Sequence, residues 1–124
     1  MPKILIADDE ESMRQLVARA IAMDGHEIVT AQDGAEALEI LTVADGQFDL
    51  LLTDIQMPVM DGIALALSVA RDFPDLTILL MTGFADQRER ASGLNAIAHD
   101  VITKPFSVAD IRTAVADALA SKAR

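Results

Sequence analysis

Acidic side chains follow two short apolar runs of this chain, at positions where they could hold a cation or act as a nucleophile. Asp8 and Asp9 come directly after the apolar run of residues 4–7. Asp54 comes at the end of a second run, which begins at residue 50. Like charges that lie close together repel, and a buried carboxylate without a partner is unfavourable. The pattern therefore predicts a divalent cation held by oxygen ligands.

A hydroxyl and an ammonium group occupy equivalent positions after two later apolar runs. Thr82 follows residues 76–81, and Lys104 follows residues 101–103. If these runs are parallel strands of one sheet, their carboxyl ends bring the acids, the hydroxyl and the lysine to the same edge. Such a group of side chains indicates a functional site, because folding alone does not require it.

The apolar runs alternate with amphipathic patterns along the whole chain. The first run is continuous rather than alternating in polarity, as expected for a strand covered on both faces. The run at 26–30 is shorter and weaker, which predicts a strand near an edge of the sheet. The predicted strands are Lys3–Ala7, 26–30, 48–53, 76–81 and 101–103.

Helical patterns lie between these runs. Asp33 with Glu36 and Ser107 with Asp110 have the spacing of N-terminal capping boxes. The first helix is expected to end near Gly25, the third to span 63–73, and the fourth, with few large apolar residues, to lie around 86–92. The residues expected to face the core are Met13, Leu16, Val17, Ala20 and Ile21 in the first helix, Leu38 and Leu41 in the second, and Val108, Ile111, Val115, Ala118 and Leu119 in the last.

Five β-α units in succession predict a parallel sheet with helices on both faces, because crossover connections are right-handed in nearly all proteins. The predicted fold class is therefore doubly wound α/β. In such folds ligands bind beyond the carboxyl ends of the strands. This rule places the site at the edge that holds Asp54.

Length, composition and charge narrow the class of protein. A chain of 124 residues with 52% hydrophobic residues is the size of one domain with a proper core. The absence of cysteine excludes disulfides, thiolate metal sites and cysteine nucleophiles. A net charge of −10 argues against binding to nucleic acid or to an anionic membrane. With no apolar stretch of membrane-spanning length and no secretory signal, we expect a soluble, cytoplasmic domain.

The functional residues fall in four segments whose joint spacing is specific. They are Asp8-Asp9, Thr53-Asp54-Ile55-Gln56-Met57-Pro58-Val59-Met60-Asp61-Gly62, Thr82-Gly83 and Lys104-Pro105-Phe106. In these segments the chain resembles the receiver domain of bacterial two-component response regulators. The resemblance implies a five-stranded, flavodoxin-like sheet with strand order 2-1-3-4-5. It also implies a single receiver domain over residues 1–124, with no output domain expected.

The resemblance assigns the acids to phosphoryl transfer. It implies that Asp54 is the phosphoacceptor, which forms an acyl phosphate by attacking a phosphoryl group on a partner's histidine. It implies that Asp9 binds Mg²⁺ (or Mn²⁺) directly, that Asp8 acts largely through water, and that the backbone carbonyl of Gln56 completes the protein ligands. From the residues alone, Asp8 and Asp9 could instead simply stabilise the N-terminus of the next helix.

The same resemblance gives roles to the remaining residues of the site. Lys104 would contact the phosphoryl oxygens, and without phosphate it could pair with Asp54. Thr82 would donate its hydroxyl to a phosphoryl oxygen and move inward on activation. Pro105 would follow a cis peptide bond, which is accessible to an X–Pro bond at modest cost.

One position departs from the family pattern. Receivers commonly have a tyrosine or phenylalanine three residues before the lysine, and Val101 stands there. Valine offers no aromatic side chain to report phosphorylation, so we expect Val101 to be a core residue. Phe84 is the nearest aromatic replacement, and we expect its exposure to change on phosphorylation. Phe84 could also shield the acyl phosphate from water, or serve only in packing or partner contact.

The expected function is a phosphorylation-dependent switch that signals through protein–protein contact. The donor would be a histidine kinase or a histidine phosphotransfer protein. The target could be the next member of a phosphorelay or a separate machine. Residues 50–66 and 79–85 resemble receivers that deliver substrates to an ATP-dependent protease. A Mg²⁺-dependent phosphatase with an aspartate nucleophile is the alternative, but Gln56 replaces the second acid that such enzymes carry. We therefore expect catalysis only of the domain's own phosphorylation and dephosphorylation.

Overall fold

The structure is a computed structural model that describes residues 1–83, 92–94 and 96–122. The strands are β1 (Lys3–Ala7), β2 (Glu27–Ala31), β3 (Leu50–Asp54), β4 (Thr77–Thr82) and β5 (Asp100–Thr103). The helices are α1 (Glu11–Ala22), α2 (Gly34–Val43), α3 (Gly62–Asp72) and α5 (Val108–Lys122), with a 3-10 turn, η1 (Ser92–Leu94). The helix predicted around residues 86–92 lies, except for Ser92, outside the described residues.

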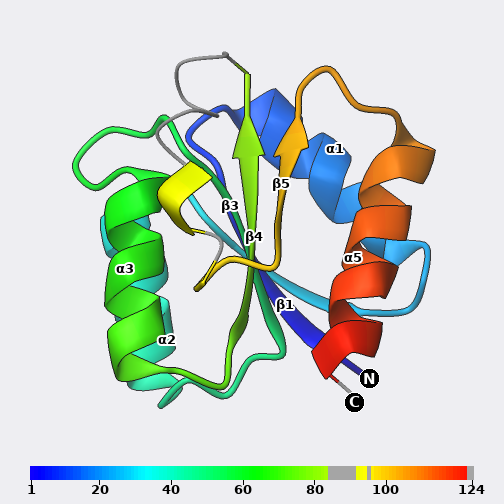
Figure 1. Ribbon diagram of the computed structural model, residues 1–124. Coiled ribbons are helices and arrows are strands. Elements are labelled where there is room, and N and C mark those ends of the chain that lie inside the picture. The colour runs from blue at the N-terminus through cyan, green and yellow to red at the C-terminus, as the bar shows by residue number, and fades with distance from the viewer. Residues whose placement is uncertain (84–91, 95, 123–124) are drawn as a thin grey trace.

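All strand pairs are parallel, and the order across the sheet is β2-β1-β3-β4-β5. Helices α1 and α5 cover one face, and α2 and α3 cover the other (Figure 1). The predicted doubly wound fold, its strand order and the edge position of the weak second strand are all confirmed. This order makes β1 and β3 direct neighbours at the centre of the sheet, so Asp8 and Asp54 lie on adjacent strand ends.

The central strands are buried on both faces, which explains their continuous apolar sequences. Ile4 and Ile6 face the core layer under α1 and α5, whereas Leu5 and Ala7 face the layer under α2 and α3. All four side chains are fully buried. Burial of one large aliphatic side chain contributes about 1.5–3 kcal/mol, so Ile4, Leu5 and Ile6 stabilise the strands that carry the site.

Side-chain caps fix where three helices begin. Asp33 Oδ1 accepts a hydrogen bond from the Glu36 N–H at 2.8 Å, at the start of α2. Asp61 accepts one from the Ala64 N–H at the start of α3. Ser107 and Asp110 exchange two hydrogen bonds of 3.0 Å at the start of α5, which is the predicted capping box.

Two predicted core positions were wrong. Leu16 is 45% exposed, because the buried stripe of α1 runs through Val17, Ala20 and Ile21, and Leu16 lies beside it. Val108 is 40% exposed, because it is the first residue of α5 and no preceding turn covers it.

Strand β1 has the predicted bounds, and the other strand and helix bounds differ from the predictions by up to three residues. Strand β3 starts at Leu50 rather than at residue 48, since Phe48 belongs to a turn in which its N–H donates to the Gly46 carbonyl. The strand also extends to Asp54 itself. Among the described helices, none is long and apolar enough to span a bilayer.

Candidate functional site

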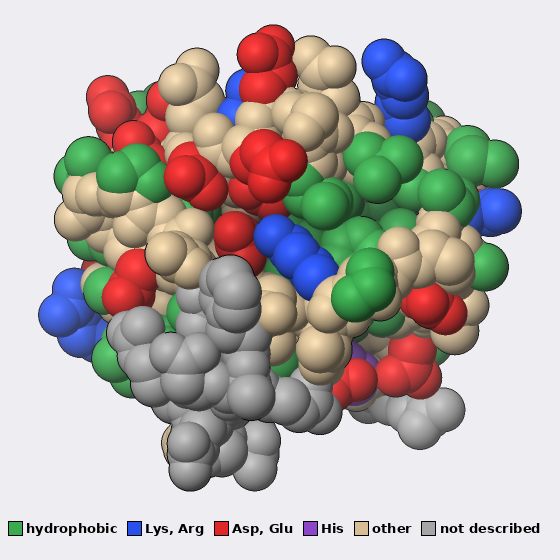
Figure 2. All heavy atoms as spheres, turned by 90° about the horizontal axis from the view of Figure 1, so that it is seen from above, with side chains coloured by type: hydrophobic (Ala, Val, Ile, Leu, Met, Phe, Trp, Pro, Cys, Tyr) green, Lys and Arg blue, Asp and Glu red, His purple; other side chains and the backbone are tan. Residues whose placement is uncertain are grey.

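The carboxyl ends of β1, β3, β4 and β5 meet at one edge of the sheet. Figure 2 looks onto this edge and shows acidic side chains gathered beside a basic one near the middle of the face. Asp8 follows β1, Asp54 and Thr82 end β3 and β4, and Lys104 follows β5. The register of the parallel ladder brings these positions together, with Ala7 paired to Thr53 and Asp54 paired to Met81.

Three carboxylates form the centre of the site. One oxygen from each of Asp8, Asp9 and Asp54 lies within 4.8 Å of the others. Asp8 is fully buried and Asp54 is only 7% exposed, whereas Asp9 is exposed to solvent. The cluster therefore has a buried floor and one open side, through which a small ligand could enter.

Backbone and side-chain contacts hold Asp8 in place. Its Oδ1 accepts a hydrogen bond from the Glu10 N–H at 3.0 Å. Arg14, one turn into α1, donates from Nη1 to the Asp8 carbonyl at 2.9 Å. The role of Arg14 was not apparent from the sequence, because nothing in its spacing indicates that its side chain returns to the end of β1.

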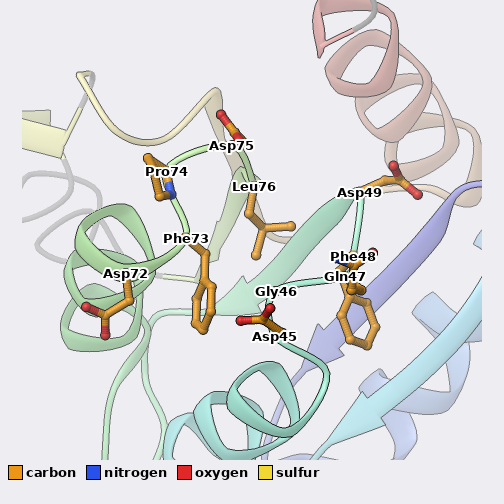
Figure 3. A pocket seen from close by; sticks show the side chains of 10 residues that line it. All are labelled: Asp45, Gly46, Gln47, Phe48, Asp49, Asp72, Phe73, Pro74, Asp75 and Leu76. Atoms are coloured by element: carbon orange, nitrogen blue, oxygen red, sulfur yellow. The ribbon is translucent and has the colours of Figure 1, made fainter.

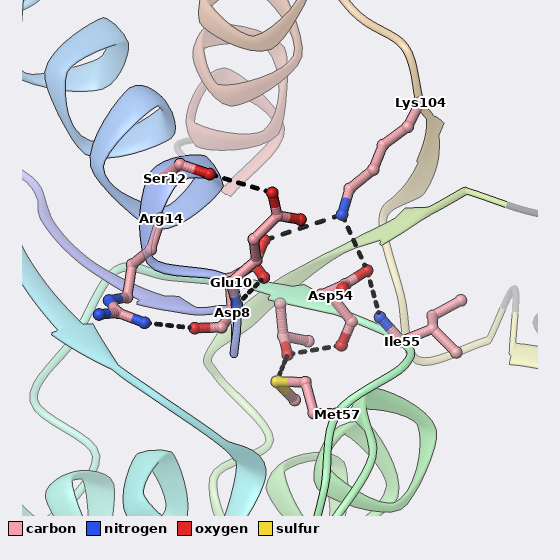
Figure 4. A network of polar contacts seen from close by, with 9 residues as sticks. Asp8, Glu10, Ser12, Arg14, Asp54, Ile55, Met57 and Lys104 are labelled. Carbon is pink, nitrogen blue, oxygen red and sulfur yellow. Dashed lines mark hydrogen bonds and ion pairs between the residues drawn. The ribbon is translucent and has the colours of Figure 1, made fainter.

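Lys104 places its ammonium group between the two buried acids (Figure 4). Its Nζ lies 3.3 Å from Asp54 Oδ1 and 3.8 Å from Asp8 Oδ2. Asp54 Oδ1 also accepts a hydrogen bond from the Ile55 N–H at 3.0 Å. The Lys104–Asp54 pairing is the resting arrangement that the sequence predicted.

One lysine does not neutralise this cluster. Burial raises the pKa of Asp54 from 3.8 to about 6, with Lys104 lowering it and Asp8 raising it. Burial also raises the pKa of Asp8, against the hydrogen bond from Glu10 and the charge of Lys104, which lower it. The site therefore holds its negative charge at a cost in free energy, and a further cation would relieve it.

The residues present fit a hard divalent cation. Within the described part of the chain, the buried Asp8 Oδ2 accepts no hydrogen bond, although Lys104 lies nearby. An orphaned, buried carboxylate oxygen beside two further carboxylates is the donor set that Mg²⁺ prefers. Gln56, the second residue after Asp54, is exposed to solvent, as is Asp9.

The structure places the remaining predicted residues around this cluster. Thr82 is fully buried, and its carbonyl accepts a hydrogen bond from the Lys104 N–H at 2.7 Å. The Lys104–Pro105 peptide bond is cis. Val101 is half-buried and packs against the core under α2 and α3. Phe84 lies outside the described residues, so both predictions about it stay predictions.

The β3–α3 loop, residues 55–61, lies within a segment that the sequence marked as a motif, but its tight packing was not predicted. The Gly62 N–H donates to the Ile55 carbonyl at 2.8 Å, which closes the loop on itself. A Cβ at Gly62 would lie 2.1 Å from the Asp54 carbonyl oxygen, so only glycine fits there. Val59 has a φ of 69° and is 86% exposed, a left-handed conformation that is unfavourable for a β-branched residue. The Asp61-Gly62 pair at a helix start was the available sequence signal.

A second hollow, of about 480 Å³, lies at the opposite end of the sheet between residues 45–49 and 72–76 (Figure 3). Two of its acids have partners: Asp49 accepts a hydrogen bond from the Lys3 N–H, and Asp72 forms an ion pair with Arg71. None of the described residues that line it is a lysine, a serine or a threonine. The chemistry therefore points to the edge that holds Asp54.

Comparison with protein families decides the identity. The family model described as the response regulator receiver domain matches residues 4–116. The chain belongs to this family. It is a phosphoryl-accepting switch of two-component signalling, as the resemblance in sequence predicted.

Individual relatives agree with this assignment. The response regulator MprA of Mycobacterium sp. (strain KMS) is 33% identical over 109 residues, which cover 88% of this chain and 46% of the relative. The probable transcriptional regulator ycf27 of Cyanophora paradoxa is 34% identical over 113 residues, 91% of this chain and 46% of that protein. The receiver domain thus spans about half the length of the curated relatives it matches.

Solved structures extend the comparison to the whole domain. A receiver domain protein from Clostridium thermocellum superposes with a TM-score of 0.90 at 27% identity, covering 99% of this chain and 98% of that one. The response regulator TrrA from Thermotoga maritima, solved in complex with Mg²⁺-BeF, has a TM-score of 0.82 at 30% identity, covering 94% and 98%.

Proposed function

We propose that Asp54 is the phosphoacceptor of this receiver domain. The observation that carries the proposal is its environment: a carboxylate 7% exposed, 3.3 Å from the Lys104 ammonium and grouped with two further acids. An aspartate with a purely structural role at the end of a strand would not require a second buried acid, Asp8, and a largely buried lysine, Lys104, beside it.

The geometry of Asp54 indicates which oxygen reacts. Among the described residues, the hydrogen bond from Ile55 and the ion pair with Lys104 both use Oδ1. We therefore expect Oδ2 to attack the phosphorus of a phosphohistidine. The new O–P bond forms as the N–P bond breaks, and the electron pair returns to the imidazole nitrogen, which takes up a proton. Hydrolysis of the resulting acyl phosphate releases inorganic phosphate.

Asp9, Asp8, Asp54 and the carbonyl of Gln56 would hold the Mg²⁺ (or Mn²⁺) ion. When bound, the cation supplies positive charge that offsets the charge of the phosphoryl oxygens. Asp9 is the exposed member and suits direct ligation, whereas Asp8 is buried and suits contact through water. The orphaned Asp8 Oδ2 supports this division of roles.

Lys104 and Thr82 would then receive the transferred group. The Lys104 ammonium, already poised at Asp54, would turn from the carboxylate to a phosphoryl oxygen as a point charge. The Thr82 hydroxyl would donate to another phosphoryl oxygen, and its movement would carry the change toward β5. Phe84, if its exposure changes, is the candidate reporter along this route, in place of the aromatic residue that Val101 replaces. Phosphorylation adds about −1.5 to −2 charge, enough to shift a two-state equilibrium.

The partners follow from this chemistry. The phosphoryl donor would be a histidine kinase or a histidine phosphotransfer protein, and the chain would catalyse only its own phosphorylation and dephosphorylation. A net charge of −10 favours output through contact with another protein over contact with nucleic acid or membrane. An ATP-dependent protease is one candidate target, and a phosphorelay partner is another. Function without an attached output domain and a cytoplasmic location stay predictions.

The test is incubation of the chain with acetyl phosphate and Mg²⁺, followed by intact-mass analysis, since no Trp or Tyr is present for a fluorescence assay. We expect one phosphoryl adduct per chain, absent with EDTA and absent in Asp54→Asn. Continuous turnover of a generic phosphomonoester would instead favour the phosphatase alternative. An adduct retained in Asp54→Asn would refute the assignment of the phosphoacceptor.

A further inference from the structure

The first residue of α2 packs directly against the backbone of the β3–α3 loop. The Gly34 N–H donates a hydrogen bond of 3.2 Å to the Met60 carbonyl. Gly34 is buried, and a Cβ built there would lie 2.4 Å from that carbonyl oxygen. Ordinary van der Waals contact begins near 3.4 Å, so no side chain fits unless the loop moves.

This contact gives a hydrogen-bond acceptor to the first N–H group of α2 and a donor to a carbonyl of the loop. The first N–H groups of a helix have no intrahelical acceptor. Asp33 caps the Glu36 N–H, and the Met60 carbonyl accepts from the Gly34 N–H. Helix α2 contributes none of the carboxylates of the site, yet its N-terminus is attached to the loop that follows Asp54.

The loop transmits its position to the site over a few residues. Met60 is four residues beyond Gln56, whose carbonyl is a proposed metal ligand. The Met60 N–H donates to the Pro58 carbonyl at 2.7 Å, and the Gly62 N–H closes the loop on the Ile55 carbonyl. These two hydrogen bonds involve Ile55 before Gln56 and Pro58 after it, so we expect a displacement of Met60 to reach the backbone around Gln56.

We propose that Gly34 is a positioning residue for the phosphorylation reaction. Because Gly34 has no side chain, α2 can pack closely against the β3–α3 loop. This packing positions the Gln56 carbonyl and Asp54 so that both can bind one cation. The inference rests on the proposed roles of Asp54 and Gln56. A methyl group at position 34 would displace the loop by roughly 1 Å, and a displacement of that size can lower reactivity about a hundredfold. Mg²⁺ requires near-ideal octahedral ligands, so its affinity should fall as well.

The experiment compares Gly34→Ala with Gly93→Ala in the full chain. A Cβ at Gly93 meets nothing within 4 Å among the described atoms, so this variant is the matched control. The dissociation constant for Mg²⁺ is measured by NMR titration of the ¹⁵N-labelled protein, and the rate of adduct formation with acetyl phosphate is measured at saturating Mg²⁺. We expect Gly34→Ala to bind Mg²⁺ about tenfold or more weakly, and Gly93→Ala to match the parent. Equal affinity in Gly34→Ala and the parent would overturn the inference.

A double variant separates loop position from side-chain crowding. The Gly34 Cβ would also lie 3.0 Å from the Met60 side chain, but the closest atom is the backbone oxygen. Met60→Ala should therefore not restore Mg²⁺ affinity to Gly34→Ala. Restoration would mean that overpacking of the core, rather than loop position, caused the loss.

The parent protein gives a second test that does not depend on the variant folding. On titration with Mg²⁺, the Gly34 amide resonance should shift in step with that of Gln56, while the Gly93 amide stays in place. A stationary Gly34 amide would contradict the proposed coupling. A parent that binds no Mg²⁺ would refute the proposed function, and this inference with it. A parent that binds Mg²⁺ as tightly as Gly34→Ala does would refute the inference alone.

Discussion

Replacing Asp54 with asparagine should stabilise the metal-free domain at neutral pH, although it removes the proposed phosphoacceptor. The amide oxygen of asparagine can still accept the hydrogen bond from Ile55, so the substitution removes mainly the buried charge. Burial raises the pKa of Asp54 from 3.8 to about 6, in spite of Lys104. That difference corresponds to about 3 kcal/mol of unfavourable free energy in the folded state once the group is ionised.

The sign of the pH dependence follows from the raised pKa. Between pH 3.8 and about 6 the folded protein keeps a proton on Asp54 that the unfolded chain has lost. Stability therefore falls as the pH rises through this window, and the loss is complete above it. The difference in free energy of unfolding between Asp54→Asn and the parent should grow from near zero below this window to about 3 kcal/mol at pH 7. Asp8, whose pKa burial also raises, is present in both proteins, and its charge contributes to the raised pKa of Asp54, so the difference measures the burial of Asp54 together with its repulsion by Asp8.

The assay is urea unfolding followed by far-UV circular dichroism, in EDTA, at a series of pH values from 4 to 7.5. Asp75→Asn is the matched control, because Asp75 is an exposed aspartate at the opposite end of the sheet, and its curve should follow the parent's. If the parent is as stable as Asp54→Asn at pH 7, or if the difference between them does not change with pH, the account of a strained acidic site is wrong.

Three further changes probe the cation, the lysine and the fold. Mg²⁺ at a hundredfold excess over its dissociation constant should stabilise the parent by about 2.7 kcal/mol, seen as a higher thermal midpoint, and Asp9→Asn should lose most of this gain. Lys104→Met keeps most of the aliphatic side chain but removes the ammonium group, so adduct formation with acetyl phosphate should slow about a hundredfold. A rate within threefold of the parent's (roughly 0.7 kcal/mol) would exclude Lys104 from the reaction. Asp33→Ala removes the hydrogen bond that caps the Glu36 N–H and should lower the free energy of unfolding by about 1 kcal/mol. Gln32→Ala, at the exposed neighbouring position, should leave the free energy of unfolding unchanged.

The sequence predicted the fold because its signals were local and repeated. The apolar runs ending in Asp8, Asp54 and Thr82 mark strands buried on both faces, and parallel strands bring the residues at their carboxyl ends to one edge. The grouping of the acids with Lys104 was predictable for the same reason. Contacts between residues that are distant in the sequence, or that depend on the direction of one side chain, were not predictable. The Arg14 side chain folds back to the Asp8 carbonyl, and the Gly34 N–H meets Met60, and neither contact has a signature in residue spacing.

Helix faces were predicted less well at their margins. The three- and four-residue spacing of α1 marked Leu16 as a core residue, because a periodic pattern cannot distinguish the centre of a buried stripe from its border. Val59 shows a different limit, since its left-handed backbone would have been expected at a glycine or an asparagine.

We propose that Asp54 itself carries the phosphoryl group. The most direct measurement treats the acetyl-phosphate-modified chain with borohydride, which reduces an acyl phosphate to the alcohol, and then maps the product by peptide mass spectrometry. We predict homoserine at position 54, dependent on Mg²⁺ during the modification, and unmodified Asp8 and Asp9. Homoserine at either of those two positions with Asp54 intact would show that Asp54 is not the phosphoacceptor.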